Sequence, residues 1–363
     1  MGAFNGQLRS NEIFSALYNM IISQEVFADN LGKHQTLVEK ARVDGSLYGD
    51  TKLYYSTDVL KSAPWGNDAE AANLLALHRP AAPECQAIHL DIFRQICLTV
   101  DNYLSKRAWA TEGAFSSFNS VMLGWMRETK RVYDGTLYNV FIGTTKSAEN
   151  AQNREIAVKG LTDAKEEAML IAQALADLIV EMGDYSRDFN DYKNLRSYGE
   201  DAIKVVWNSK FVNKIRKIDL PTIFHKDGLV DKFEEEILPA RYFGTPNAAK
   251  VLAANNDGSY RSMLEADYTV NGVVTHVFPG DLIPAGVDIA AGEGYAEDAD
   301  VICKVLVKLP PYMSAFEVGT SFFNPKSLTE NHYLTFGHNT IEYLKNYPFI
   351  TVKAVAASED SGD

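Results

Sequence analysis

The sequence predicts an α+β fold in which strands and helices occupy separate stretches of the chain. Apolar residues alternate with polar ones along residues 51–60 and again along 86–100, which is the period of a half-buried strand. Residues 163–182 instead repeat apolar residues at spacings of three and four, the period of an amphipathic helix. The chain has 363 residues, of which 46% are hydrophobic, so it can bury a sizeable core.

The first part of the chain is predicted to be an arm. Ser10 is a typical N-cap for an amphipathic helix that reaches about Gln24. From Phe27 to Tyr48 glycines interrupt the pattern, which favours an extended segment. At the other end, the small acidic residues from Ser358 onward have the composition of a disordered tail.

The two alternating segments are expected to pair as a long ribbon. At ~3.3 Å per residue, residues 86–100 would span roughly 45–50 Å. The connection, 61–85, contains prolines and a predicted short helix from Asn67 to His78. Because an isolated two-stranded ribbon is marginally stable in water, another surface must cover its apolar face. The candidate contact residues are Tyr55, Trp65, Leu74, Leu75, Ile88, Leu90, Ile92 and Arg94.

Two long helices are predicted after the ribbon. The first starts near Thr111 and continues to Gly143, with a break near Gly135. The second has a capping box formed by Asp163 and Glu166, and Gly183 ends it. Its apolar face is assigned to Met169, Leu170, Ala172, Leu175, Ala176 and Ile179.

The rest of the chain is predicted to be mainly β structure. The pattern indicates a buried strand within 201–207, then a helix from Ser209 to about Lys217 and another helix start at Pro221. Residues 244–300 are rich in Gly, Ala, Asn and Asp, which predicts a loop-rich lobe with a hairpin turn at Asn271-Gly272. Further strands are predicted at 301–309, 333–336 and 349–354, and Glu234-Glu235-Glu236 is interpreted as a solvated helix face.

Charge and cysteine content exclude several classes of protein. The net charge is −13, so the counterion release that drives nucleic-acid binding is lacking. The three cysteines, Cys85, Cys97 and Cys303, form no close pair, which argues against a disulfide framework or a cysteine zinc site. No signal-peptide pattern and no apolar run of ~20 residues is present, so a soluble protein made in the cytoplasm is expected.

The sequence contains no short catalytic or phosphate-binding motif, and no cofactor is expected. Gly292-Glu293-Gly294 lacks the third glycine of a phosphate loop and is interpreted as a plain loop. His332 and His338 would share one face of a strand, as packed histidines rather than a metal pair. A solvated acidic loop is favoured over a calcium site for Asp288, Glu293, Glu297, Asp298 and Asp300.

Three stretches, taken with the order of elements, resemble major capsid proteins of tailed bacteriophages, which have the Hong Kong 97-type fold. The closest resemblance is to those of small, short-tailed, protein-primed podophages. Residues 244–300 depart from the family pattern. The stretches are Arg94–Asp101 running into Trp109 and 115–125, Asp188–Asn190 through Ser197-Tyr198 to Ile203–Trp207, and Asn324–Lys326 through Asn331–Tyr333.

The resemblance implies an N-terminal arm, an extended loop that lies over a neighbouring subunit, a spine helix, and peripheral and axial domains. The implied boundaries are 1–45 for the arm, 46–101 for the extended loop and ribbon, 102–243 for the spine helix, peripheral domain and start of the axial domain, 244–300 for an inserted lobe, and 301–363 for the returning strands and acidic tail.

The function implied by the resemblance is structural, not enzymatic. Subunits would form pentamers and hexamers of an icosahedral virion shell around double-stranded DNA, with scaffold and portal as partners and no membrane. Some family members cross-link a loop lysine to a neighbour's asparagine; Lys52, Lys61 and Asn324 are the residues in question here, and cross-linking is not expected. The alternatives are an encapsulin-like nanocompartment subunit and an enzyme with a carboxylate site in residues 244–300.

Overall fold

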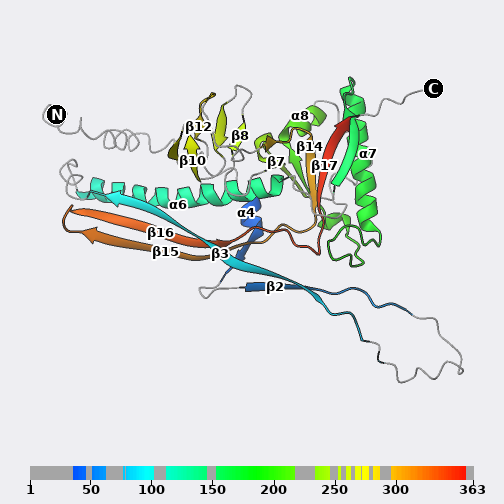
Figure 1. Ribbon diagram of the computed structural model, residues 1–363, viewed down its shortest axis with the longest axis horizontal. Coiled ribbons are helices and arrows are strands. Elements are labelled where there is room, and N and C mark those ends of the chain that lie inside the picture. The colour runs from blue at the N-terminus through cyan, green and yellow to red at the C-terminus, as the bar shows by residue number, and fades with distance from the viewer. Residues whose placement is uncertain are drawn as a thin grey trace, which may run out of the picture.

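A long helix, α6 (Glu112–Gly143), lies along a sheet of long strands, and a second sheet stands at the C-terminal end of this helix (Figure 1). The structure is a computed structural model. It describes residues 36–45, 51–62, 77, 79–101, 112–144, 153–216, 234–245, 252–254, 259–262, 266–270, 272–277, 281–286 and 296–356.

The first sheet has the strand order β1-β15-β16-β3-β2. Its longest strand, β3, has two different partners: residues Glu84–His89 pair with β2, and Leu90–Val100 pair with β16. The predicted pairing of residues 51–60 with 86–100 is therefore confirmed only between Thr51–Ser56 and the start of β3, and the chain's own C-terminal hairpin pairs with the second half of β3. The strands are β1 (Arg42–Asp44), β2 (Thr51–Ser56), β3 (Glu84–Val100), β15 (Tyr312–Asn324) and β16 (Thr329–Asn339).

The second sheet has the order β4-β17-β14-β5-β6, and helices cover both of its faces. Val205 and Trp207 of β5 pack with helix α7, while Val206 between them packs with α6 and α4. Successive residues of a strand point to opposite faces, so the sheet separates two apolar cores. The elements are α4 (Thr36–Ala41), β4 (Asn153–Lys159), α7 (Ala164–Gly183), β5 (Lys204–Asn208), α8 (Ser209–Arg216), β6 (Glu234–Leu238), β14 (Val301–Leu306) and β17 (Phe349–Ala356).

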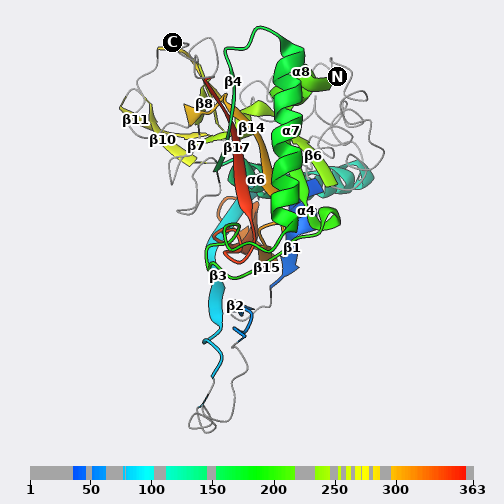
Figure 2. The same ribbon diagram turned by 90° about the vertical axis from the view of Figure 1, so that its right-hand side faces the viewer.

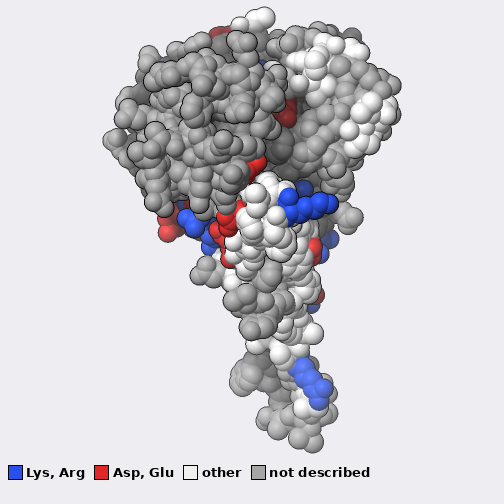
Figure 3. Space-filling view, turned by 90° about the vertical axis from the view of Figure 1, so that its left-hand side faces the viewer, with Lys and Arg blue, Asp and Glu red and all other residues white. Residues whose placement is uncertain are grey.

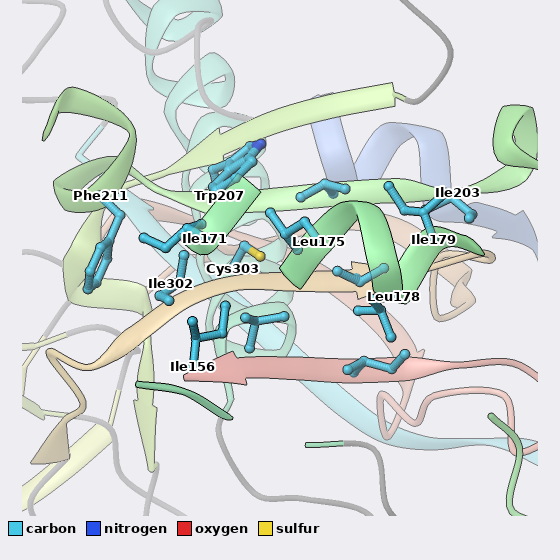
Figure 4. Packing of buried hydrophobic residues seen from close by; sticks show 14 of the residues in the cluster. Ile156, Ile171, Leu175, Leu178, Ile179, Ile203, Trp207, Phe211, Ile302 and Cys303 are labelled. Atoms are coloured by element: carbon cyan, nitrogen blue, oxygen red, sulfur yellow. The ribbon is translucent and has the colours of Figure 1, made fainter. Parts of the chain in front are cut away.

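Helix α7 has the predicted ends, and its predicted apolar face is confirmed in part, since Ala172, Leu175 and Ile179 are buried. The Asp163 side chain accepts a hydrogen bond from the Lys165 backbone N–H at 2.9 Å and caps the helix. Met169 and Leu170, both predicted to be buried, are exposed. The residues that face the sheet are Ala168, Ile171, Ala172, Leu175, Leu178, Ile179 and Met182, several of which are seen in Figure 4 against Trp207 and Ile302.

Helix α6 runs through Gly135 without the predicted break. A single glycine costs a helix only ~1 kcal/mol relative to alanine. Tyr133 and Tyr138 on either side of it are fully packed, and their burial offsets that cost. Two other elements also differ from expectation: α4 forms inside the segment predicted to be extended, and Glu234-Glu235-Glu236 lies in strand β6 rather than in a helix.

Residues 244–300, for which the composition predicted a loop-rich lobe, contain short strands in their described parts. The hairpin at Asn271-Gly272 is confirmed on its described side: β10 and β11 pair antiparallel, and Gly272 has φ +78°, which a type I′ turn requires. The predicted helices at 10–24 and after Pro221 lie outside the described residues, as do the tail from Ser358 and all of the predicted helix at 67–78 except Leu77, which is not helical. The strands of this stretch are β7 (Gly244–Thr245), β8 (Leu252–Ala254), β9 (Tyr260–Ser262), β10 (Ala266–Val270), β11 (Val273–Val277), β12 (Leu282–Ile283) and β13 (Ala296–Glu297).

Candidate assembly surfaces

The arm formed by β2 and the first part of β3 projects away from the rest of the molecule (Figures 1 and 2). The pairing is antiparallel, from Thr51 opposite His89 to Ser56 opposite Glu84. Tyr55 is 65% exposed, and Leu60, just beyond the strand, is 77% exposed. Within the described residues nothing covers these apolar side chains, and exposed apolar groups that lie close together mark interaction surfaces.

The base of the arm is held to the body by a cluster of polar contacts, which we call the clasp (Ser56, Thr57, Asp58, Gln86 and their partners). The buried Ser56 hydroxyl donates to Asn346 Oδ1 at 2.6 Å and accepts from Asn194 Nδ2 at 2.7 Å. Arg196 donates to Ser56 Oγ at 3.0 Å and to the Thr57 carbonyl at 2.7 Å. Each side chain satisfies a partner on another element, so the clasp fixes where the arm leaves the body.

Asp58 extends the clasp to the turn after α7. It accepts from the Leu195 backbone N–H at 3.0 Å and from Arg187 Nη1 at 2.6 Å. The Leu195 N–H and the Arg187 guanidinium lower the pKa of Asp58 to about 2, so the carboxylate stays ionised throughout the physiological range.

On the opposite strand, Gln86 donates to the Tyr343 carbonyl and accepts from the Lys345 N–H, both at 3.0 Å. Both strands of the arm are therefore anchored, at equivalent positions near its base.

A second polar group, buried between α6 and the first sheet, joins the helix to the hairpin. Asp134 accepts from Tyr312 Oη at 2.6 Å and from Lys130 Nζ at 2.9 Å. Burial and the Asp134 carboxylate raise the pKa of Tyr312 well above its usual range. His338 lies 2.9 Å from Tyr133 Oη, and burial lowers its pKa, so it is neutral at pH 7.

The hairpin of β15 and β16 presents another exposed apolar surface, at its turn. Phe322 is 61% exposed, and Phe323 and Leu328 are also exposed. Figure 3 faces this end of the molecule, where mostly uncharged side chains form a ridge above the arm. Between α6 and the hairpin is an open groove of about 460 Å³, lined by Met126, Arg127, Glu317, Gly319, Thr320, Ser321, His332, Tyr333 and Leu334.

The predicted contact residues fall into three groups. Tyr55 is exposed on the arm, and Arg94 stacks over the Tyr133 ring of α6, with its guanidinium carbon 5.2 Å from the ring centroid. Ile88 is buried within the chain itself, and Leu90 and Ile92 are half-buried. Trp65, Leu74 and Leu75 lie outside the described residues. A role in contacts between subunits stays a prediction for each of them.

The residues considered for metal or catalytic chemistry have structural partners instead. Asp298 pairs with Lys353 at 2.8 Å and Asp300 with Lys159 at 2.7 Å. His338 is packed and hydrogen-bonded, as predicted, and His332 is half-buried. In the described ranges no group of three or more His, Cys, Asp or Glu residues could hold a metal ion. Asp288 and the glycine loop 292–294 lie outside those ranges.

Sequence reasoning missed the completely buried cation Lys304 in the central strand β14. Its Nζ donates to Thr351 Oγ1 at 2.6 Å and lies 4.4 Å from the centre of the Phe349 ring. Complete burial lowers the pKa of Lys304 to about 7. The alternating pattern of residues 301–309 predicted one buried face only, whereas every residue of β14 is buried because helices cover both faces of the sheet.

The described chain contains no helix that is long and apolar enough to cross a membrane. The fold combines a long helix along a hairpin sheet, a second sheet between helices and a projecting arm. This α+β fold matches phage capsid structures and is consistent with the Hong Kong 97 type.

Two solved structures illustrate the match. One is the capsid structure of Staphylococcus phage Andhra, with a TM-score of 0.54 and 12% identity, covering 91% of this chain and 84% of that chain. The other is the structure of head fiber and inner core protein gp22 of native bacteriophage P68, with a TM-score of 0.56 and 9% identity, covering 87% of this chain and 83% of that chain. At such identities the similarity establishes the fold. No protein-family model matches the sequence, and no curated protein matches it.

Proposed function

We propose that the chain is the major capsid protein of a tailed bacteriophage, a structural subunit that forms pentamers and hexamers of an icosahedral shell. One observation carries the proposal: the arm is built and anchored by the fold, yet its apolar side chains have no covering surface among the described residues. A neighbouring subunit would supply that surface. The capsid fold, matched over most of the chain, supports the same conclusion.

In this proposal each region has a mechanical task. Residues 46–101 are the extended loop that lies over a neighbour, the helix that starts at Glu112 is the spine, and 161–182 is the main peripheral helix. Residues 244–300 are an insertion. The chain's net charge of −13 is compatible with a shell that encloses double-stranded DNA without binding it tightly.

The partners follow from the same proposal. Scaffold and portal proteins would guide assembly in the host cytoplasm, and the mature location is the virion. The resemblance of the sequence to capsid proteins of small, short-tailed phages supports a podophage origin.

The experiment that tests the proposal is assembly of the purified full chain, followed by sedimentation velocity and electron microscopy. Closed shells of uniform diameter are expected, either spontaneously or in the presence of a scaffold protein. A monodisperse monomer at every concentration, with or without scaffold, would contradict it.

A matched pair of variants tests whether the arm is the assembly surface. Leu60→Asp places a charge on the most exposed apolar residue near the arm's base and is expected to prevent assembly while the monomer stays folded. Ser62→Asp adds the same charge two residues away, at an exposed polar position, and is expected to leave assembly intact. If the two variants assemble to the same extent, the arm is not the assembly surface.

The same particles distinguish a capsid from a nanocompartment. A capsid is expected to package DNA in the presence of the phage machinery. Shells that instead retain a co-purified enzyme and form without scaffold would indicate an encapsulin-like compartment.

A further inference from the structure

Among the residues that the structure describes, the outer edge of β15 is open along most of its length. β1 pairs with it in parallel, but only from Tyr312 to Ser314. The last backbone bond on this side joins the Gly45 N–H to the Ser314 carbonyl at 3.3 Å. None of the strands that the structure describes follows β15 from Ala315 to Asn324 on that side. The backbone N–H and C=O groups on this edge therefore lack a ladder partner among the described residues.

The open edge has few of the features that prevent strands from pairing with other chains. A bulge lies between Ala315 and Val318, and Glu317 is the strand's one charged residue. From Val318 to Asn324 the strand has no charge, no proline and no bulge. Phe322 and Phe323 point to opposite faces and both are exposed. An exposed, uncharged edge of this length is a template for another strand.

A second open edge lies at the other side of the same sheet. β2 is the terminal strand of the order β1-β15-β16-β3-β2, and its one strand partner among the described residues is β3. The arm and the hairpin turn point in opposite directions along the molecule (Figure 1). Within one subunit the two edges are separated by β16 and β3, about three strand spacings of ~4.8 Å, so they cannot pair with each other.

We propose that β2 of a second copy adds to β15 along residues 318–324, so that the first sheet continues from one subunit into the next. The lengths agree: β2 has six residues and the open stretch has seven. Leu53 and Tyr55 share one face of β2, and they would lie beside an exposed phenylalanine of β15. The inference rests on the proposed self-assembly and specifies its contact.

This contact joins two different surfaces, so it is heterologous and generates a ring when the rotation closes. Pairing of β15 with a second β15 across a two-fold axis would leave β2 uncovered. The head-to-tail arrangement instead satisfies both open edges with one interface, which is why β2 is the occupant we choose.

Disulfide trapping tests the pairing. The exposed Cys85 and Cys97 are first replaced by serine, while the buried Cys303 is kept. Chains that carry Leu53→Cys or Tyr55→Cys are assembled with chains that carry Thr320→Cys or Phe322→Cys, distinguished by a mass tag, and oxidised mildly. At least one pairing is expected to give the mixed dimer as its main product. Val273→Cys, equally exposed but in the β10–β11 hairpin, serves as the control that should not trap.

Three outcomes are possible once wild-type particles are confirmed by electron microscopy. A mixed dimer that the control lacks supports the proposal. Dimers of two β15 cysteines, or no mixed dimer from any pairing in intact particles, overturn it while the capsid function stands. If the wild-type chain forms no particles in any condition, the shell proposal itself fails, and the two failures are thereby distinguished.

Discussion

Replacing Lys304 by methionine should stabilise the unassembled subunit at neutral pH. The lysine is completely buried in β14 beside Phe349, with Thr351 as its hydrogen-bond partner. Its pKa falls from 10.5 to about 7 because burial penalises the charged form. The folded state thus binds this proton less tightly than the unfolded chain, and wild-type stability rises as the pH increases from about 7 towards 10.5. Methionine fills a similar volume and carries no proton.

The size of the effect follows from the two pKa values. At pH 7 the folded lysine is about half protonated, whereas the unfolded one is fully protonated. At ~1.4 kcal/mol per pKa unit, burial of the lysine lowers the free energy of unfolding at pH 7 by roughly 4 kcal/mol. In Lys304→Met the Thr351 hydroxyl loses this hydrogen-bond partner, which reduces the expected stabilisation by ~1–2 kcal/mol. The net stabilisation expected for Lys304→Met at pH 7 is therefore about 2–3 kcal/mol.

Urea unfolding at pH 7.0 and pH 9.5 measures both the stability and its slope with pH. The wild type is expected to gain stability at the higher pH relative to Lys304→Met. Lys308→Met provides the control, because Lys308 lies two positions after β14 and is exposed. It should change stability by no more than ~1 kcal/mol, the value of its exposed cation–π contact with Tyr347, and keep the pH dependence. If Lys304→Met destabilises the subunit, or keeps the wild-type dependence of stability on pH, the reasoning is refuted.

Three further predictions concern packing and the clasp. Gly143→Ala should destabilise the subunit strongly, because the added Cβ would lie 1.9 Å from the backbone carbonyl oxygen of Tyr242. Gly124→Ala has no atom within 4 Å of the added Cβ and should stabilise the helix by ~0.5–1 kcal/mol. Thermal unfolding of both variants tests these predictions. Leu175→Ala should cost ~2–4 kcal/mol by urea unfolding, and Leu170→Ala, on the exposed side of α7, less than ~1 kcal/mol; similar losses would contradict the observed helix face. Arg196→Ala should make trypsin cleavage in the arm several-fold faster without changing cleavage of α7; unchanged rates would show that the clasp does not hold the arm.

The sequence predicted those elements whose pattern is local and strong. Strand β3 and the start of α7 are examples, because alternation and a cap residue are both visible in a short window. The face of α7 was predicted in part: Ala172, Leu175 and Ile179 are buried as expected. Apolar residues occur on several sides of this helix, and only packing against the sheet selects Ile171 and Leu178 over Met169 and Leu170. Strand β15 was not predicted at all: glycine, serine and threonine in its middle give no alternation, and pairing with β16 is what makes it a strand.

The candidate surfaces were predictable to a smaller extent. The exposed Tyr55 was named from the pattern of the arm, whereas the clasp was not. Its members Ser56, Arg196 and Asn346 are separated by 140 to 290 residues along the chain. Polar residues of this kind are common on surfaces, and no spacing rule connects them. The stacking of Arg94 on Tyr133 was missed for the same reason, although Arg94 itself was named as a candidate contact residue.

The continuity of β3 has a mechanical consequence. One unbroken strand of 17 residues forms part of the arm at its start and the centre of the first sheet at its end. A pull along the arm would act parallel to the strand, and the hydrogen bonds between β3 and β16 lie perpendicular to it. All of those bonds would share the load at once, instead of opening one after another as in a peeled hairpin. A subunit tethered through its arm would therefore transmit tension into its body with little extension.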